Sequence, residues 1–566
     1  MFGMVALWGV SPAFADPRSD LKAVALSAGS VPDAPVSTSA FSPATGSQKA
    51  SNKFPGRLIL EPTLETARAN ALRNGGDRLG DTQRQVDVLP AMVIDLVQSG
   101  DDLIPLERGL VQGEHPYWTY FVGVGKVWDE PDDAGWTRAV LPFALQERNQ
   151  NCTHNGLMSF VFRADGAVSN VYYQVGSETC TYFQADLWGL VTARTGTGSG
   201  AAAEAVSDYR AELARRLPVK PLSALAQDFP GTDISAFQPP SLNQVTVFGL
   251  VVDGINYRDG CETRFGRYVL CDELHLPSYS TAKSAYAGLA VMRMAQQWPD
   301  FPNQSIASLV PACDLPDGRW DDVTVDDALD MTTGNYTASV YMSDEDEFVG
   351  DFLSQPTHAG KVQVACEQYS RRGIPGDQWV YHTSDTYLVI AAMDAWLAQQ
   401  GGQRRDSLED IVVADLWKPL TLSPVSQSSQ RTADGAAQAF GGLGLTFLSD
   451  DVARIGQFLG PDQGFVQGQP VFASAELDQA LFRVDGAPPE HKATALFAYS
   501  NGFWGGPGQA WAGCQNDTWL PHMSGFGGIT IALLPNGMTY YVFADSGQFQ
   551  WAAAAGEANQ MRAYCN

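Results

Sequence analysis

Ser280-Thr281-Ala282-Lys283 places a hydroxyl group and an amine three residues apart, directly before an apolar stretch with helical spacing. Residues i and i+3 of a helix lie on one face, with about 5–6 Å between their Cβ atoms, so Lys283 can reach Ser280. A serine hydroxyl needs a neighbouring base to act as a nucleophile at neutral pH. Free N–H groups at the helix N-terminus also favour the negative charge that develops on its oxygen. The stretch therefore predicts a nucleophilic serine with a lysine base.

The S-x-x-K pattern has a simpler explanation, in which Ser280 caps the helix and Lys283 is a solvated charge of its first turn. Ser19-Asp20-Leu21-Lys22 has the same pattern in a polar leader, so the pattern by itself does not identify a site. Apolar residues continue at helical spacing after Ser280, and Pro299 follows Trp298. This spacing predicts a helix over residues 280–298 that is buried on one face.

Length and composition restrict the class of protein. The chain has 566 residues, which suggests two or three domains, and a formal net charge of −27. This charge argues against nucleic acid, anionic glycans or an anionic membrane surface as partners. No apolar run approaches the about 18 residues of a membrane span. The seven histidines form no metal-binding motif, so neither a metal nor another cofactor is expected.

Two features predict export to the periplasm or the medium. Residues 1–15 resemble a signal peptide, with an apolar run and Ala13-Phe14-Ala15 as the cleavage site. Eight cysteines without metal-type spacing favour four disulfides in an oxidising compartment. Sequential pairing is the simplest of many arrangements: Cys152–Cys180, Cys261–Cys271, Cys313–Cys366 and Cys514–Cys565. Buried free thiols in a cytosolic protein are the alternative.

After the predicted signal peptide of residues 1–15, local composition divides the chain into four segments. Residues 16–54 are rich in Ser, Pro, Ala and Thr, which predicts a disordered linker. Residues 55–194 carry strand-like aromatic and β-branched runs and predict a small β-rich domain, and residues 195–240 form a linker with one helix. Residues 241–566 have the rhythm of a mixed α/β (α+β) domain. It contains a strand over 245–252, a hairpin over 529–543 with a Pro-Asn-Gly turn, and a C-terminal helix over 550–564.

Further motifs follow the first in order: Met331-Thr332-Thr333-Gly334, Pro375-Gly376-x-x-Trp379-x-Tyr381, Gly441-Gly442-Leu443 and His522-Met523-Ser524-Gly525-Phe526-Gly527-Gly528. Together with Ser280-x-x-Lys283 they resemble the serine β-lactamase and penicillin-binding-protein superfamily. The closest likeness is to its class C-like branch, which includes family VIII esterases, D-aminopeptidases and DD-carboxypeptidases, and 6-aminohexanoate-dimer hydrolase. The likeness covers about residues 244–566 and leaves the β-rich front unexplained.

The resemblance implies a fold and a set of roles. The fold would be an antiparallel sheet flanked by helices, here preceded by the β-rich domain. Ser280 would be the acylated nucleophile, Lys283 its base and Tyr381 a second proton-transfer group. The backbone N–H groups of Ser280 and Gly525 would form the oxyanion hole. The substrate-binding positions would be Thr383, His522 and Ser524.

Three departures from the family pattern bear on the substrate. His522 stands in place of the usual lysine, and a histidine with a pKa of about 6.5 is mostly neutral at pH 7. Thr383 replaces the usual asparagine after Tyr-x, and no acidic residue can be assigned as a deacylation base. These departures favour hydrolysis of a small ester or amide over carboxylate-bearing β-lactams. The alternatives are a peptidoglycan-directed D-amino-acid peptidase or β-lactamase, and a lactamase-like binding protein without turnover.

Overall fold

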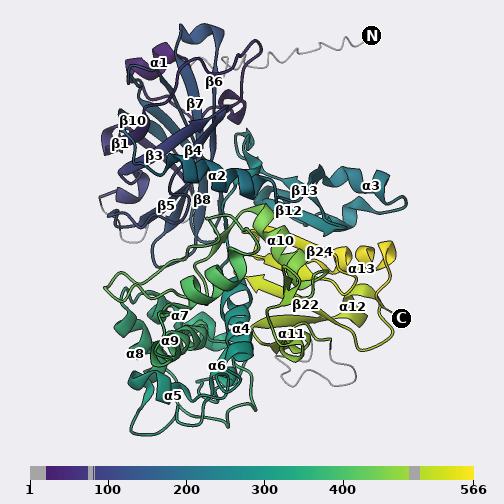
Figure 1. The fold of residues 1–566 in the computed structure, drawn as a ribbon. Helices are drawn as coiled ribbons and strands as arrows, with labels where there is room; N and C mark the ends of the chain where they lie inside the picture. The colour runs from purple at the N-terminus through teal and green to yellow at the C-terminus, as the bar shows by residue number, and fades with distance from the viewer. Residues whose placement is uncertain (1–20, 74–80, 82, 484–496, 566) are drawn as a thin grey trace, which may run out of the picture.

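The computed structural model describes residues 21–73, 81, 83–483 and 497–565. An antiparallel β-barrel comes first in the chain, and a larger part follows in which helices pack on both faces of an eight-stranded sheet (Figure 1). This arrangement confirms the α+β class, the antiparallel sheet flanked by helices and the β-rich front. The predicted signal peptide lies outside the described residues.

The barrel is a ten-stranded antiparallel sheet in the order β1-β3-β4-β6-β7-β8-β9-β10-β2, with β5 paired to β7. It closes because β10 pairs with β1 as well as with β9 and β2. Closure leaves only β2 and β5 with a single strand partner each, and the inward-facing apolar side chains fill the interior. The strands are β1 (Gly56–Glu61), β2 (Ala67–Arg73), β3 (Met92–Ser99), β4 (Asp102–Pro105), β5 (Trp118–Val122), β6 (Gly125–Asp129), β7 (Thr137–Glu147), β8 (Thr153–Phe162), β9 (Val171–Thr179) and β10 (Gln184–Thr197).

The segment before the barrel corrects one expectation, since its described part, residues 21–54, is not a disordered linker. It contains α1 (Ala23–Ala28) and buries Leu21, Leu26 and Phe41 in the same core as barrel residue Tyr172. The side-chain amide of Gln174 also bonds the backbone N–H and C=O of Val36, at 2.9 and 3.0 Å. The composition is polar, but its few apolar residues match an apolar outer face of the barrel. A compositional argument does not detect such a match.

A connecting region follows, with α2 (Ala202–Leu213) and α3 (Leu225–Asp228), and leads into the second sheet. Its order is β11-β13-β12-β24-β23-β22-β21-β20, and all neighbours are antiparallel except β11 and β13. Strands from the start and the end of this part meet in the middle, where β12 pairs with β24. The strands are β11 (Val219–Pro221), β12 (Val245–Val252), β13 (Ile255–Gly260), β20 (Ala498–Ser500), β21 (Phe503–Pro507), β22 (Trp519–Gly525), β23 (Ile529–Leu533) and β24 (Thr539–Ala544).

Helices cover the two faces of this sheet unequally. α12 (Gly508–Ala512) and α13 (Ala552–Met561) pack on one face around Trp551 and Leu520. The larger helical layer lies against the other face, where α10 contacts β12, β23 and β24. Its helices are α4 (Leu289–Gln297), α5 (Ile306–Leu309), α6 (Val325–Leu329), α7 (Ser343–Leu353), α8 (His358–Glu367), α9 (Thr383–Gln399), α10 (Ser449–Leu459), α11 (Ser474–Ala480) and a π-helix over Leu408–Trp417.

The predicted helix after Ser280 is present, but its first part is a π-helix and not an α-helix. A π-helical segment over Lys283–Gly288 continues as α4, and the π segment packs against β21 and β22. Gly288 allows this approach, because a Cβ there would lie 2.3 Å from the carbonyl oxygen of Asn501. π-helical turns inside α-helices are frequent at functional sites. The hairpin of β23 and β24 and the terminal helix α13 also confirm their predictions.

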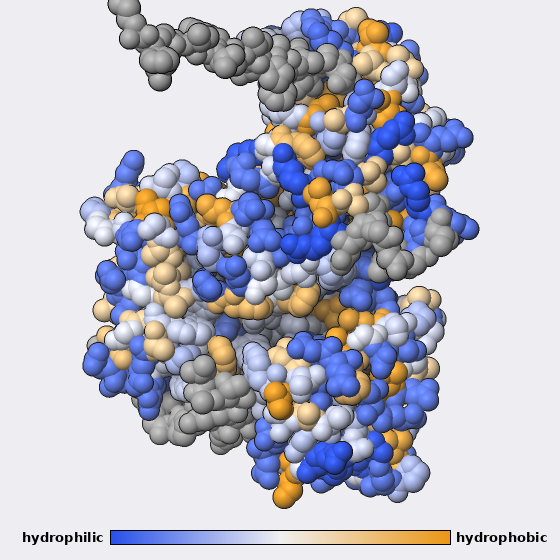
Figure 2. All heavy atoms as spheres, turned by 180° about the vertical axis from the view of Figure 1, so that it is seen from behind, coloured by the Kyte–Doolittle hydropathy of each residue, from blue (hydrophilic) through white to orange (hydrophobic). Residues whose placement is uncertain are grey.

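Four disulfides join the eight cysteines in sequential order: Cys152–Cys180, Cys261–Cys271, Cys313–Cys366 and Cys514–Cys565. The first lies inside the barrel and the others in the second part. Figure 2 shows a mainly hydrophilic surface with scattered apolar residues, in keeping with the charge of −27. Among the described residues, no helix combines the length and the hydropathy that crossing a membrane requires.

We expect the purified protein to contain no thiol that reacts with a maleimide under denaturing, non-reducing conditions, because all eight cysteines are paired. Reduction should lower the melting temperature, since each disulfide typically contributes about 2–4 kcal/mol. Mass spectrometry after maleimide treatment measures the first, and differential scanning fluorimetry the second. Eight labelled thiols before reduction would contradict this pairing.

Candidate active site

Ser280 lies at the end of a tight turn that connects a short strand to the helix. The strand is β16 (Leu276–Pro277), which pairs with β17 (Thr446–Phe447). The backbone N–H and the hydroxyl of Thr281 both donate to the carbonyl oxygen of Ser278, at 3.1 and 2.8 Å. Tyr279 has φ +41°, a left-handed conformation that is uncommon for a non-glycine residue. The turn leaves Ser280 partly exposed while its neighbours are buried.

Lys283 is buried beneath Ser280 with three hydrogen-bond partners. Its Nζ donates to Ser280 Oγ at 3.1 Å, to Thr383 Oγ1 at 2.9 Å and to the carbonyl oxygen of Gly442 at 3.2 Å. Burial lowers the pKa of Lys283 to about 8, although the negative charges of Glu345 and Asp385 oppose this shift. Near pH 8, Lys283 is therefore a neutral amine in a substantial fraction of the protein molecules. In that form its lone pair can accept the proton of the Ser280 hydroxyl.

Tyr381 completes the group of three residues that the sequence predicted to act together. The Lys283 Nζ lies 4.8 Å from the centre of the Tyr381 ring. Burial raises the pKa of the Tyr381 hydroxyl well above its usual value, Glu345 raises it further, and a side-chain contact with Ser280 opposes both. Tyr381 is therefore a neutral phenol at physiological pH, which suits a proton donor.

Glu345 of α7 is a residue of the site that the sequence did not reveal. Its carboxylate accepts the backbone N–H of Thr383 at 2.8 Å and the Thr383 hydroxyl. It thereby caps the N-terminus of α9, where a negative charge is favourable. Glu345 lies in the acidic run Asp344–Glu347, 36 residues before Tyr381, and nothing in that spacing announces a contact.

Thr383 consequently has a different place from the one predicted. It is 4% exposed and its hydroxyl is occupied by Lys283 and Glu345, so it supports the lysine and does not present a free group to a substrate. The neighbouring His382 lies between Asp385 and Asp344, at 3.1 and 3.2 Å. Their charges raise the pKa of His382 to about 9 against the effect of burial. This buried charged group fixes the first turn of α9.

The glycine-rich motif that begins at His522 runs along β22 and reaches the turn that carries Ser280. A Cβ on Gly525 would lie 2.7 Å from the carbonyl oxygen of Ser278 and 3.3 Å from Thr281 Cγ2. Only glycine fits so close an approach, which brings the Gly525 backbone next to the nucleophile turn. Ser524 precedes it on the same strand and is partly exposed.

His522 does not face this site, which corrects its predicted role in substrate binding. Its ring packs on Trp511 and Trp551, with centroid distances of 5.9 and 5.1 Å, on the face of the sheet covered by α12 and α13. Side chains alternate along a strand, and Met523 instead joins the core on the helical face. The residue of this motif that points to the nucleophile's side is thus apolar. The sequence could not show which face of β22 each residue would occupy.

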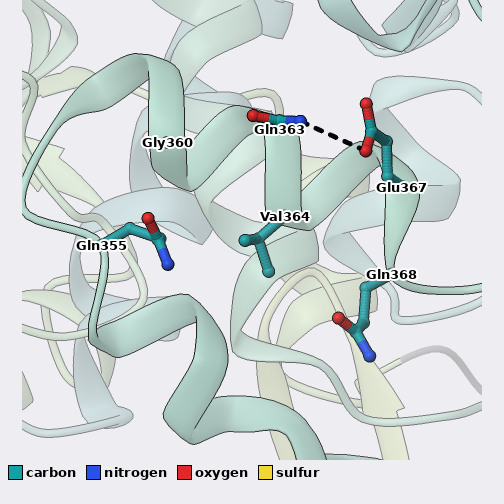
Figure 3. A pocket seen from close by; sticks show the side chains of 6 residues that line it. All are labelled: Gln355, Gly360, Gln363, Val364, Glu367 and Gln368. Atoms are coloured by element: carbon teal, nitrogen blue, oxygen red, sulfur yellow. Dashed lines mark hydrogen bonds between the residues drawn. The ribbon is translucent and has the colours of Figure 1, made fainter.

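Aromatic side chains cluster around Tyr381. Trp504 stacks on Tyr381 at 5.9 Å, and Trp379 lies at the same centroid distance. Tyr341, which is 48% exposed, stacks on Trp379 at 5.9 Å. A substrate group next to Tyr381 would therefore meet an apolar surface. A separate hollow of about 480 Å³ on the outer side of α8 contains none of these residues (Figure 3).

No family model matches the sequence, and no curated protein matches it. The structure is similar to that of EstCE1, a hydrolase with promiscuous acyltransferase activity, at 15% identity and TM-score 0.42, over 62% of this chain and 100% of the other. It is also similar to a D-stereospecific amidohydrolase from Streptomyces, at 12% identity and TM-score 0.39, over 57% and 96%. A class C β-lactamase is similar at 15% identity and TM-score 0.39, over 56% and 90%. At these identities and TM-scores the similarity assigns no activity to the chain.

We expect the reactivity of Ser280 toward a fluorophosphonate to rise with pH, with a midpoint near 8, because the neutral fraction of Lys283 increases as the pH passes its pKa of about 8. Lys283→Arg keeps the charge but cannot lose its proton, so its labelling rate should fall by more than about tenfold, or ~1.4 kcal/mol in barrier. Stopped-time labelling between about pH 6 and about pH 10 measures both. A flat profile, or an active Lys283→Arg, would exclude lysine as the base.

His522→Lys should destabilise the protein without improving the hydrolysis of carboxylate-bearing substrates, because the new ammonium would be buried against Trp511 and Trp551. Burial lowers the pKa of His522 to about 4, so this environment already disfavours a positive charge. The free energy of unfolding should fall by about 2 kcal/mol or more in a urea titration. Faster nitrocefin hydrolysis by this variant would show that residue 522 does face the site.

Proposed function

We propose that this chain is a serine hydrolase that cleaves small, uncharged esters or amides through an acyl-enzyme on Ser280. The observation that carries the proposal is the 3.1 Å contact between Ser280 Oγ and the buried Nζ of Lys283. The alternative explanation makes Lys283 a solvated charge of the first helical turn, whereas Lys283 is 1% exposed. Here burial brings the pKa of Lys283 close to neutrality, which a base for serine requires.

In the proposed reaction, protons move between Ser280, Lys283 and Tyr381. Neutral Lys283 takes the proton from Ser280 Oγ as the oxygen bonds to the substrate carbonyl carbon. The backbone N–H groups of Ser280 and Gly525 stabilise the resulting oxyanion. The bond to the leaving alcohol or amine then breaks, and this group takes a proton from Tyr381, which regains one from Lys283. Water hydrolyses the acyl-enzyme by the reverse sequence of proton transfers.

Apolar and acidic surroundings support an uncharged substrate. Met523, not a lysine, joins the core on the nucleophile's side of β22, and aromatic rings surround Tyr381. Glu345 and Asp385 place negative charge near Lys283. A substrate carboxylate would gain no ammonium partner from β22 and would be repelled by these groups. This argues against penicillins and D-alanyl peptides as substrates. The reason is the apolar and acidic surroundings of the site, and not a neutral His522 in contact with the substrate.

Export belongs to the same proposal. Four disulfides in one chain favour an oxidising compartment, so we take the protein to act in the periplasm or outside the cell. We likewise take residues 55–194 and 241–566 as its two domains. The protein would then bind its small-molecule substrate in the periplasm or outside the cell.

Ser280→Ala should abolish both hydrolysis of a nitrophenyl acetate and covalent labelling by a fluorophosphonate, because the reacting oxygen is lost. The matched control is Ser19→Ala, which removes the serine of the other S-x-x-K pattern and should change neither measurement. Circular dichroism establishes that both variants fold. Full labelling of Ser280→Ala would place the nucleophile elsewhere.

The substrate class is tested on the wild type by comparing kcat/KM for the nitrophenyl ester and for nitrocefin. The ester should be hydrolysed more efficiently by about tenfold or more, a difference of ~1.4 kcal/mol in transition-state stabilisation. Comparable efficiency on nitrocefin would favour a β-lactamase or a cell-wall peptidase. No turnover and no labelling would favour a binding protein.

A further inference from the structure

The turn before Ser280 has to be held in an unfavourable conformation. Tyr279 adopts φ +41°, although it has a Cβ and a bulky ring. Such a backbone persists only where its surroundings fix it. The hydrogen bonds that surround this turn therefore indicate which part of the molecule sets the position of Ser280.

Asn151 of the barrel provides two of these bonds. Its Oδ1 accepts the Tyr279 backbone N–H at 2.7 Å and the Ser278 hydroxyl at 3.1 Å. The residue is fully buried and lies between β7 and β8, 128 positions before Tyr279 in sequence. The barrel thus supplies the polar group that satisfies the strained turn.

The same amide also holds the loop that supports Lys283. Asn151 Oδ1 accepts the backbone N–H of Gly444 at 2.9 Å, and its Nδ2 donates to the carbonyl oxygen of Leu445 at 3.2 Å. Two residues before Gly444, the carbonyl oxygen of Gly442 accepts the hydrogen bond from Lys283. One side chain therefore links the nucleophile turn to the loop that contacts the base.

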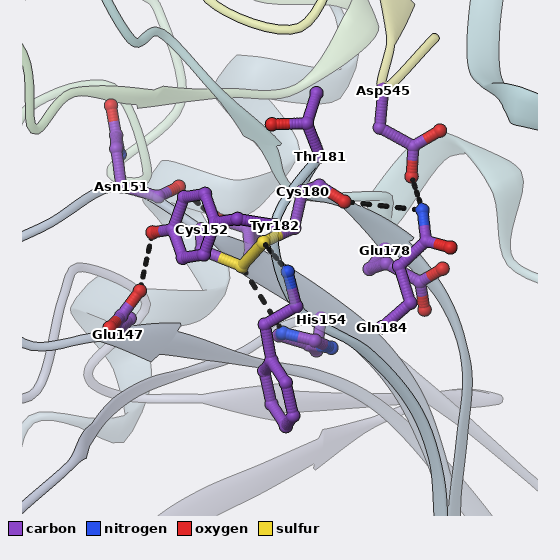
Figure 4. Close-up of a disulfide and its surroundings, with 12 residues drawn as sticks. Glu147, Asn151, Cys152, His154, Glu178, Cys180, Thr181, Tyr182, Gln184 and Asp545 are labelled. Atoms are coloured by element: carbon purple, nitrogen blue, oxygen red, sulfur yellow. Dashed lines mark hydrogen bonds between the residues drawn. A yellow bond between two sulfur atoms is a disulfide. The ribbon is translucent and has the colours of Figure 1, made fainter. Parts of the chain in front are cut away.

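The barrel fixes Asn151 itself through a disulfide. Asn151 is followed by Cys152, which is joined to Cys180 between β9 and β10 (Figure 4). In the same view Tyr182 reaches back and bonds Glu147 at the end of β7. His154 Nε2 lies 3.3 Å from Cys152 Sγ, but both sulfurs are committed to the disulfide and so are not metal ligands. The disulfide after Asn151 and the Tyr182–Glu147 hydrogen bond before it thus tie both flanks of the residue to the segment between β9 and β10.

We infer that Asn151 is a positioning residue for Ser280 and Lys283, so that the barrel is a working part of the hydrolase site and not an independent module. The inference rests on the proposed function of Ser280. It assigns to the front domain the task of holding the strained turn and the Gly442 loop in register.

Asn151→Ala is tested against Asn155→Ala, a matched control in the same barrel. Asn155 also crosses to the second part, where it exchanges two hydrogen bonds of 2.9 Å with the backbone of His275, five residues before Ser280. Both variants remove a buried amide that joins the two parts, so both should lower the melting temperature. Only Asn151→Ala should slow fluorophosphonate labelling by more than about tenfold and displace the pH midpoint of labelling from the wild-type value.

Labelling is measured well below both melting temperatures, on protein shown to be folded by near-ultraviolet circular dichroism. If either alanine variant does not fold, the similarly shaped pair Asn151→Leu and Asn155→Leu replaces it. Each of these removes both the Oδ1 acceptor and the Nδ2 donor, and the same difference in labelling rate is expected. Equal labelling rates for the two variants of either pair would overturn the inference. If the wild type is labelled in that experiment, the proposed function still stands. Unlabelled wild type would overturn both.

Discussion

The burial of the Lys283 amine is the constraint on which the rest of the site depends. An ammonium group removed from water is costly, and the protein offsets that cost with three acceptors from three separate elements: Ser280, Thr383 and the Gly442 loop. These partners converge only if the π-helical segment, α9 and the loop before β17 are all in place. The same burial gives the lysine a pKa suited to proton transfer, so the packing of these elements and the proposed chemistry have one cause.

The surroundings of Lys283 are not only apolar, because carboxylates lie near it and offset part of the effect of burial. Glu345 caps α9 and, with Asp385, raises the pKa of Lys283, which burial alone would lower further. His382 also pairs with Asp385, and with Asp344, by lying between the two carboxylates. Buried charges of this kind are stable only when they are paired and hydrogen-bonded. The network therefore fixes both the start of α9, which follows Tyr381 closely, and the basicity of the amine.

The barrel contributes to the site through polar contacts that hydrophobic packing would not supply. Asn151 bonds three backbone groups and one hydroxyl of the second part, and Asn155 bonds two backbone groups there. Arg264 forms ion pairs with Glu178 and Asp186 of the barrel. Amide and guanidinium groups have directional donors and acceptors, so they specify one relative placement of the two parts. Such directional contacts are what a strained turn at Tyr279 requires.

The sequence by itself determined the features that depend on local spacing. Ser280 and Lys283 meet because i and i+3 share a helix face, and the β23–β24 hairpin follows from its turn residues. Tertiary structure decided the rest. Alternation along β22 separates His522 from Met523, but only the packing of the sheet decides which of them faces the helical layer. Glu345, Asn151 and the apolar residues of the segment 21–54 act through contacts with residues far away in sequence, and no local pattern encodes such contacts. A side chain's neighbours along the chain fix its conformational preferences, whereas its partners across the fold fix its solvation and hence its chemistry.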